Sequence, residues 1–257
     1  MQYYTSDRKQ HYIWGQSKNI QVFTLTPNIG YSMNKVLIRQ FGLRGYPGVY
    51  KAMAEFTSRR DPGTADEIWC LEHEPVFTLG LAGRTEHLLD PGNIPVHKVD
   101  RGGQVTYHGP GQLVVYPLFD LKRRGISIRR FVNLLEQSVI EFLAAFDLEA
   151  VRRKGMPGVY LADSKIAALG VRVRRGCCYH GLALNVNMDL SPFKRINPCG
   201  YPGLEVTQLA DRGFSLSADD AAEQFLPCLL EQFGCDEVET YDERNISFPE
   251  IMAASVK

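Results

Sequence analysis

Short apolar runs separated by proline, glycine and aspartate are the feature that most constrains the fold of this chain. Three of them, residues 68–71, 76–79 and 112–116, are rich in β-branched and aromatic side chains. Runs of this length and composition are typical of β-strands and are shorter than ordinary helices. The first half of the chain is therefore predicted to form a β-sheet.

Three helices are predicted from apolar residues at helical spacing. The first follows Pro47 and ends at the turn 61–63, and the second follows Ser127, a residue type that caps helix N-termini. The third extends from near Ser217 to Phe233. The pattern predicts an α/β (α+β) fold, in which helices flank a mixed β-sheet.

Residues 165–173 and 179–186 are two further strand-like segments, separated by a basic turn that contains Gly176. Glycine adopts the backbone angles that tight hairpin turns require. We therefore expect a β-hairpin here. Patterned sequence begins near Val36, so residues 1–32 are predicted to be an N-terminal extension and residues 33–257 a single catalytic domain.

Composition and charge exclude several classes of protein. The chain has 257 residues, with 29 lysines and arginines against 29 acidic residues, so its formal net charge is zero. A non-specific nucleic-acid binder would carry a strong positive charge, and none is expected here. The sequence lacks a long apolar stretch and a signal-peptide core, so we expect a cytoplasmic protein that does not bind membranes.

Three segments combine glycine with polar residues beside predicted strands: 101–111, 165–170 and 197–203. Glycine lets the backbone approach a ligand closely and leaves its N–H groups available. Taken alone, the first segment is also compatible with a tight surface turn. None of the three matches a phosphate-binding or dinucleotide-binding pattern, so nucleotide use is not indicated.

The sequence Asn197-Pro198-Cys199-Gly200 is suited to presenting a thiol. Pro198 fixes its own backbone and Gly200 frees the next step, so Cys199 is expected at an exposed bend. The remaining cysteines are interpreted as reduced, buried apolar residues. They are Cys70, Cys177, Cys178, Cys228 and Cys235.

A cysteine needs a nearby cation or base to act as a nucleophile at neutral pH. The candidates are Lys165 and His108, with His180 as a further possibility. Lys165 begins an apolar strand, where partial desolvation is expected to lower its pKa. All three also fit ordinary structural roles, and the histidine and cysteine spacings do not indicate a metal site.

Three long motifs resemble one family. They are RGGQVTYHGPGQLVVYPL, KIAALGVRVRRGCCYHGLALNVNMDLSPF and RINPCGYPGLEVTQL, which occur in this order and closely resemble the lipoyl(octanoyl) transferases of lipoate biosynthesis. The resemblance covers roughly residues 33–210. It implies the α/β fold shared by biotin and lipoate protein ligases and a reaction without cofactor or metal.

The resemblance also implies roles for individual residues. Cys199 matches the nucleophile that carries the acyl thioester, and Lys165 matches the residue that tunes it. The positions that match acyl-substrate contacts are Arg101, Gly102, Gly103, Gln104, Val105, Thr106, Tyr107, His108, Ala168, Leu169, Gly170, Gly181, Leu182 and Ala183.

The implied reaction transfers an octanoyl group from octanoyl-acyl carrier protein to a lysine. The acceptors would be lipoyl domains of 2-oxoacid dehydrogenases and the glycine cleavage H protein. Three alternatives stay open at this point. One is an ATP-dependent lipoate or biotin protein ligase, another a hydrolase that uses Cys199 and His108, and the third a non-catalytic module that binds lipoyl domains or carrier protein.

Overall fold

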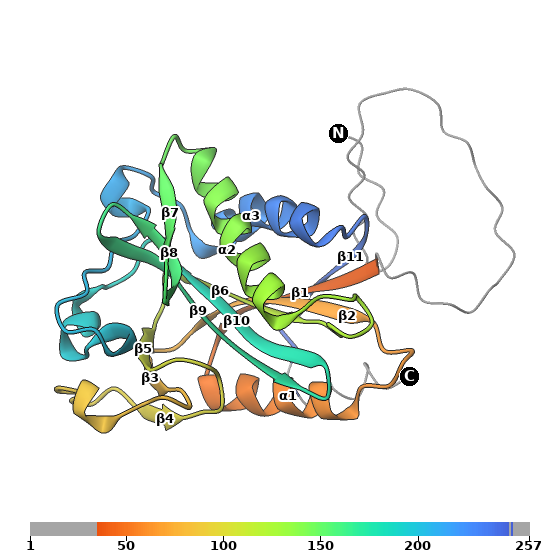
Figure 1. Ribbon diagram of the computed structural model, residues 1–257, viewed down its shortest axis with the longest axis horizontal. Coiled ribbons are helices and arrows are strands. Elements are labelled where there is room, and N and C mark those ends of the chain that lie inside the picture. The colour runs from red at the N-terminus through yellow and green to blue at the C-terminus, as the bar shows by residue number, and fades with distance from the viewer. Residues whose placement is uncertain (1–34, 247, 249–257) are drawn as a thin grey trace, which may run out of the picture.

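A computed structural model describes residues 35–246 and 248 and contains a mixed eight-stranded sheet, a separate three-stranded sheet and three α-helices (Figure 1). The large sheet has the order β11-β1-β2-β6-β10-β9-β8-β7, and the small one the order β4-β3-β5. The pairs β1–β11, β1–β2 and β3–β4 are parallel, and the other pairs are antiparallel. The predicted extension, 1–32, lies outside the described residues.

The strands are β1 (Lys35–Arg44), β2 (Asp66–His73), β3 (Val76–Leu79), β4 (Val96–Lys98), β5 (Val105–His108), β6 (Gln112–Leu118), β7 (Ala150–Arg153), β8 (Met156–Leu161), β9 (Ser164–Arg174), β10 (Cys177–Asn185) and β11 (Glu237–Asp242). The α-helices are α1 (Tyr46–Arg59), α2 (Ile128–Ala144) and α3 (Ala218–Phe233). Short 3₁₀ turns occur at Thr85–His87, Ser191–Arg195, Pro198–Gly200 and Ala210–Arg212. None of the helices among these residues is long and apolar enough to cross a membrane.

The central strands of the large sheet are buried on both faces because their side chains alternate between two cores. In β2, Ile68 and Cys70 pack with α2 and α3, while Trp69 and Leu71 pack with α1. Figure 1 shows α1 on one face of the sheet and the pair α2 and α3 on the other. This two-sided burial explains why the predicted strand runs are almost continuously apolar.

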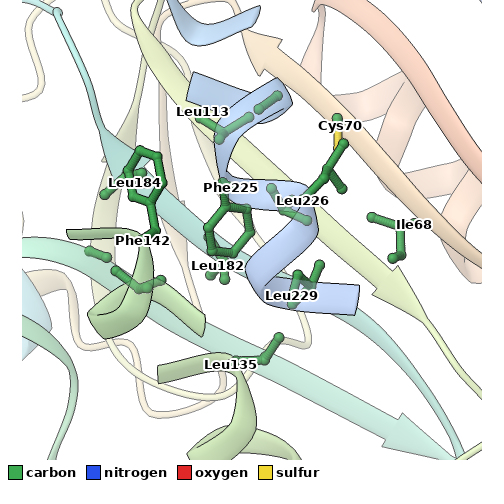
Figure 2. Packing of buried hydrophobic residues seen from close by; sticks show 14 of the residues in the cluster. Ile68, Cys70, Leu113, Leu135, Phe142, Leu182, Leu184, Phe225, Leu226 and Leu229 are labelled. Atoms are coloured by element: carbon green, nitrogen blue, oxygen red, sulfur yellow. The ribbon is translucent and has the colours of Figure 1, made fainter. Parts of the chain in front are cut away.

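Helix α3 inserts the side chains of Phe225 and Leu229 between α2 and the sheet (Figure 2). Both are fully buried, as is Phe142 of α2, whose ring meets that of Phe225 edge to face at 5.9 Å between centroids. Burying a phenylalanine contributes about 2 kcal/mol or more. The region after residue 210, which carries no family motif, therefore supplies part of the main core.

The predicted helix boundaries are confirmed by the caps in the structure. The side chain of Ser127 accepts a hydrogen bond from the Arg130 backbone at the start of α2. Ser217 and Asp220 form a reciprocal capping box at the start of α3. The predicted hairpin is also present, as β9 and β10 joined at Gly176, whose φ is +90°.

The three-stranded sheet forms a second, smaller core at one end of the large sheet, at the lower left of Figure 1. Phe77 of β3 and Tyr107 of β5 pack there against Phe193 and Ile196. The Tyr107 and Phe193 rings meet edge to face at 5.5 Å between centroids. This packing fixes the segment that leads directly into Cys199.

Candidate active site

Two motif segments far apart in the sequence meet by strand pairing. In the β9–β10 register, Ala168 lies opposite Ala183, Leu169 opposite Leu182 and Gly170 opposite Gly181. The family resemblance assigns both triplets to substrate contact, and the antiparallel hairpin brings them together. Because neighbouring strand residues face opposite sides, Leu169 and Leu182 pack toward the core that contains α2 and α3, whereas Ala183 packs on the face that α1 covers.

The loop that precedes β5 crosses the β9–β10 pair closely. A Cβ on Gly170 would lie 3.0 Å from the Gly102 carbonyl oxygen and 3.1 Å from Cδ of Arg101, so only glycine permits the approach without a shift of the loop. The Gly102 N–H donates to the Val171 carbonyl at 3.0 Å. Arg101 is buried and donates to the carbonyl and hydroxyl oxygens of Thr78, which holds the loop against the small sheet.

A cavity opens between this loop, the β9–β10 surface and the Cys199 turn. The space between its atoms, including the open mouth, is about 480 Å³. Its lining residues are Tyr46, Arg101, Gly103, Gln104, Val105, Thr106, His108, Tyr116, Ala168, Leu169, Gly170, His180, Gly181, Leu182, Ala183 and Cys199.

Most residues that the sequence assigns to substrate contact line this cavity, and two do not. Gly102 faces β9, and Tyr107 points into the core of the small sheet because neighbouring strand residues face opposite sides. Tyr46 and Tyr116 also line the cavity, although neither stands in the glycine-rich segments that point to a site. Tyr46 begins α1, and only the three-dimensional contact places its ring 6.1 Å from that of His108.

Cys199 occupies a strained bend, as its flanking residues predict. Its φ is +57° and its ψ +15°, an uncommon conformation for a residue with a side chain. The bend is anchored by hydrogen bonds from Asn197 N–H to the His87 carbonyl at 2.8 Å and from Gly200 N–H to the Asn197 carbonyl at 2.9 Å. Cys199 is half-buried at the cavity wall.

Four of the other five cysteines are more buried than Cys199, and the expectation of burial is wrong for Cys228. Cys70, Cys177, Cys178 and Cys235 are buried as expected, and Cys228 is half-buried. Burial raises the pKa of the Cys70 and Cys178 thiols to about 12, so both stay protonated at neutral pH.

Lys165 is directed toward Cys199 by an irregularity between β8 and β9. The pairing register shifts between Val159 and Tyr160, so that Tyr160 lies opposite Lys165. Such bulges re-aim side chains and occur often beside active sites. The Lys165 backbone also bonds to the chain beyond the Cys199 turn, through Glu205 at 2.9 Å and Thr207 at 3.0 Å. Lysine and cysteine are therefore held by one connected framework.

The Lys165 ammonium has defined partners although the side chain is almost fully buried. Nζ lies 3.0 Å from Cys199 Sγ and 3.0 Å from the Pro157 carbonyl oxygen. It also lies 5.2 Å from the centroid of the Tyr160 ring, within cation–π range. A thiol and an amine at this distance can exchange a proton and exist as a thiolate–ammonium pair.

The expectation of a lowered pKa for Lys165 is wrong for the state in which Cys199 is a thiolate. Burial does act in that direction, but the negative charge of Cys199 and hydrogen bonds to Cys199 and Tyr160 outweigh it. The pKa of Lys165 is therefore raised above its usual 10.5. Lys165 is a cation at neutral pH as long as the thiolate faces it.

The histidines in and behind the cavity are neutral. His108 is buried beside His73, and burial lowers the pKa of His108 to about 3 and that of His73 to about 4. Gln112 donates its amide to Asn185 and accepts from His108 Nδ1 at 2.7 Å, which leaves His108 Nε2 as an acceptor. His108 therefore lacks the positive charge that would stabilise a thiolate, whereas Lys165 has it.

These two histidines predict a loss of stability in mild acid. In the unfolded chain each takes up a proton near pH 6.5, but in the folded protein only near pH 3 or 4. Protons therefore favour unfolding as the pH falls below 6.5, and each histidine should lower the free energy of unfolding by about 2 kcal/mol between pH 7 and pH 5. Urea denaturation at the two pH values measures this.

The matched variants for that measurement are His108→Gln and His97→Gln. The first should reduce the difference in stability between pH 7 and pH 5, because glutamine does not titrate. The second replaces a half-buried histidine of β4, outside the buried pair, and is the control for a histidine-to-glutamine substitution as such. Equal pH dependence in the wild type and His108→Gln would contradict a neutral, buried His108.

Metal-ligating residues do not gather at this site. Within residues 35–246 and 248, three or more histidine, cysteine, aspartate or glutamate side chains nowhere form a group that could hold a metal ion.

The fold and site match a known catalytic domain. A model of the lipoyl protein ligase A/B catalytic domain matches residues 51–230. The structure of lipoate-protein ligase A bound with ATP is similar in fold, with a TM-score of 0.65 at 17% identity over 86% of this chain and 94% of that one. The class of protein is thus an α/β catalytic domain of the lipoyl protein ligase A/B type, which confirms the predicted fold.

Sequence similarity narrows this class. An octanoyltransferase from Xanthomonas axonopodis pv. citri is 57% identical over 197 residues, which cover 77% of this chain and 85% of the relative. An octanoyltransferase from Shewanella halifaxensis is 52% identical over 205 residues, which cover 80% of this chain and 94% of the relative. The chain belongs to the octanoyltransferase family and is an acyltransferase.

Proposed function

We propose that this protein transfers an octanoyl group from octanoyl-acyl carrier protein to a lysine of a lipoyl domain, through an octanoyl thioester on Cys199. The observation that carries the proposal is the 3.0 Å contact between Lys165 Nζ and Cys199 Sγ at the wall of the cavity. The names of the relatives indicate that the transferred group is octanoyl. Cys199 is the nucleophile, and Lys165 is the cation beside it.

In the first half-reaction, the Cys199 thiolate attacks the thioester carbonyl of the carrier-bound octanoyl group. The carbonyl carbon forms a bond to Sγ, its bond to the carrier's sulfur breaks, and that thiolate leaves with a proton from Lys165 or solvent. The Lys165 ammonium, 3.0 Å from Cys199 Sγ, stabilises the thiolate that makes this attack.

Acylation changes the charge around Lys165 and prepares the second half-reaction. Once Cys199 is a neutral thioester, the charge that raised the pKa of Lys165 is gone, and burial, which lowers that pKa, remains. Lys165 can then release its proton and act as a base toward the incoming lysine amine. The amine attacks the thioester, an amide forms, and Cys199 leaves as a thiolate that restores the pair.

The cavity wall provides the apolar contact that an octanoyl chain needs. Along β9 and β10 this wall contains the cross-strand pairs Ala168–Ala183 and Gly170–Gly181, whose small side chains leave room for a chain. At about 0.8 kcal/mol for each buried methylene, the six methylenes of the chain would contribute roughly 5 kcal/mol. The acceptors we propose are lipoyl domains of 2-oxoacid dehydrogenases and the glycine cleavage H protein, in the cytoplasm.

Dependence on ATP distinguishes this function from ligation of a free acid. Thioester-to-amide transfer runs downhill, so octanoyl-carrier protein and a lipoyl domain should yield octanoylated domain over many turnovers without nucleotide. A lipoate ligase would instead require ATP and free octanoate or lipoate. Mass spectrometry of the lipoyl domain measures the product, and hydrolysis to free octanoate without domain modification would indicate a hydrolase.

A further inference from the structure

Glu136 of α2 is a buried carboxylate that the proposed chemistry does not use. It is 5% exposed, and its neighbours on the same helix face, such as Leu135 and Val139, are fully buried apolar residues. Removing a carboxylate from water costs several kcal/mol unless it is paired and hydrogen-bonded. A charge at this position therefore needs a specific partner.

Its two oxygens have separate partners. Oε1 accepts a hydrogen bond from the Gly158 N–H at 2.9 Å. Oε2 lies 3.1 Å from Nε of Arg152, whose side chain is 38% exposed. The carboxylate is thus bonded on one side to a backbone amide and on the other to a partly solvated arginine.

The same peptide group connects Glu136 to the active site. The N–H of Gly158 and the carbonyl of Pro157 belong to one peptide bond, and this carbonyl accepts the hydrogen bond from Lys165 Nζ at 3.0 Å. A peptide whose N–H is bonded to an anion carries more negative charge on its oxygen, because the group is conjugated. Its carbonyl is then a stronger acceptor for an ammonium.

Glycine is required for this peptide to lie against the lysine. Gly158 has a φ of +137°, and a Cβ there would lie 2.7 Å from the Ala167 carbonyl oxygen and 3.1 Å from Lys165 Nζ. A side chain would displace the lysine or the strand. The close approach of the 157–158 peptide to Lys165 is therefore built into the backbone.

We propose that Glu136 is a positioning residue for the Lys165 ammonium, acting through the peptide between Pro157 and Gly158. Glu136 stabilises the charged form of Lys165 and directs one of its N–H bonds away from Cys199 Sγ, so that another points at the sulfur. The inference deepens the proposed function and rests on it for its catalytic consequence. The predicted effect on the protonation of Lys165 can be measured without octanoyl transfer.

The other titratable and charged groups near Lys165 are few. Cys199 faces it from the nucleophile turn, and Tyr160 faces it from β8. The guanidinium of Arg153 lies 4.7 Å from the centroid of the Tyr160 ring. A test of Glu136 must therefore hold Cys199 and Tyr160 constant.

The test is a titration of Lys165 by NMR in full-length protein that carries Cys199→Ala, so that the thiolate does not contribute. The ¹³Cε and ¹⁵Nζ signals of Lys165 are followed against pH in lysine-labelled protein and assigned by their loss in Lys165→Arg. Adding Glu136→Gln keeps an amide oxygen that can accept from Gly158 but removes the charge. We expect the proton affinity of Lys165 to fall about fivefold.

Two further variants complete the test. Glu141→Gln, on the same helix, removes a half-buried carboxylate bonded to Gln137 and Gln232 and should leave the Lys165 titration unchanged. Arg152→Gln leaves the charge of Glu136 less compensated and should shift the titration to higher pH. If Glu136→Gln does not fold, the Arg152→Gln titration tests whether the charge of Glu136 affects Lys165.

A Lys165 midpoint that stays the same in folded Glu136→Gln, or in Arg152→Gln if the former does not fold, would overturn the proposal. So would a shift without any change at the Gly158 amide resonance, because the peptide would then not be the link. Absence of octanoyl transfer would count against the proposed function and leave this titration valid. The two claims can therefore fail separately.

Discussion

Replacing Cys199 with alanine should reduce octanoyl transfer by about 10⁴-fold or more, because the acyl-enzyme cannot form. The fold should be unaffected. Alanine and cysteine tolerate the positive φ of this bend equally, and the side chain is half-buried in a turn rather than packed in a core. Steady-state kinetics with octanoyl-carrier protein and a lipoyl domain, together with the melting temperature, measure both effects.

The control for this variant is Cys228→Ala. Cys228 is a half-buried thiol of α3, and it packs against the main core away from the cavity. Its replacement should leave the transfer rate within about twofold of the wild type and cost at most about 1 kcal/mol of stability. Cys199→Ala that retained more than a hundredth of wild-type activity would contradict a covalent route through this residue.

Replacing Lys165 with methionine should slow transfer by about 10²–10³-fold, because both half-reactions lose their proton carrier. Methionine fills similar space and lacks the charge. Alkylation of Cys199 by iodoacetamide at pH 7 should slow as well, since the thiolate loses its ammonium partner. A normal alkylation rate in folded Lys165→Met would show that another group ionises Cys199.

The Lys165→Arg variant separates the two roles of the lysine. Arginine keeps a positive charge but does not release its proton, so alkylation should persist while transfer from the acyl-enzyme to the acceptor fails. In the wild type, the transfer from octanoyl-Cys199 should accelerate with rising pH, because the thioester removes the charge that holds the Lys165 proton. Single-turnover rates between pH 6 and pH 9 measure this dependence.

Much of the fold could be predicted from local patterns. The helix starts at Ser127 and Ser217 depend on capping contacts within a few residues, and the hairpin depends on a turn at Gly176. Such features are encoded by neighbouring residues. The position of β11 beside β1 is different, because parallel pairing joins segments about 200 residues apart and leaves no local signal.

The candidate site was predictable to the extent that it lies on motifs. Cys199 and Lys165 stand in motif segments, and the structure places their reacting atoms 3.0 Å apart. Glu136 could not be predicted, because on the sequence it is one polar residue of an amphipathic helix. Its link to Lys165 depends on a glycine backbone conformation and on the β8–β9 register shift.

The direction in which the pKa of Lys165 shifts could not be predicted from the sequence either. Desolvation could be inferred from the apolar strand around the lysine, but the opposing effect comes from a thiolate 34 positions away. Which of the two dominates depends on a distance, and strand pairing sets that distance. A pKa shift cannot be predicted from sequence when it depends on an ion pair between residues that are far apart in the chain.

The intact mass of the protein after mixing with octanoyl-carrier protein, in the absence of acceptor and ATP, tests the central claim most directly. We expect a gain of one octanoyl group, located on Cys199 by peptide mapping. This group should be lost when a lipoyl domain is added, with an equal amount of octanoylated domain formed. Transfer to the domain without any octanoylated enzyme, or a gain that persists in Cys199→Ala, would contradict it.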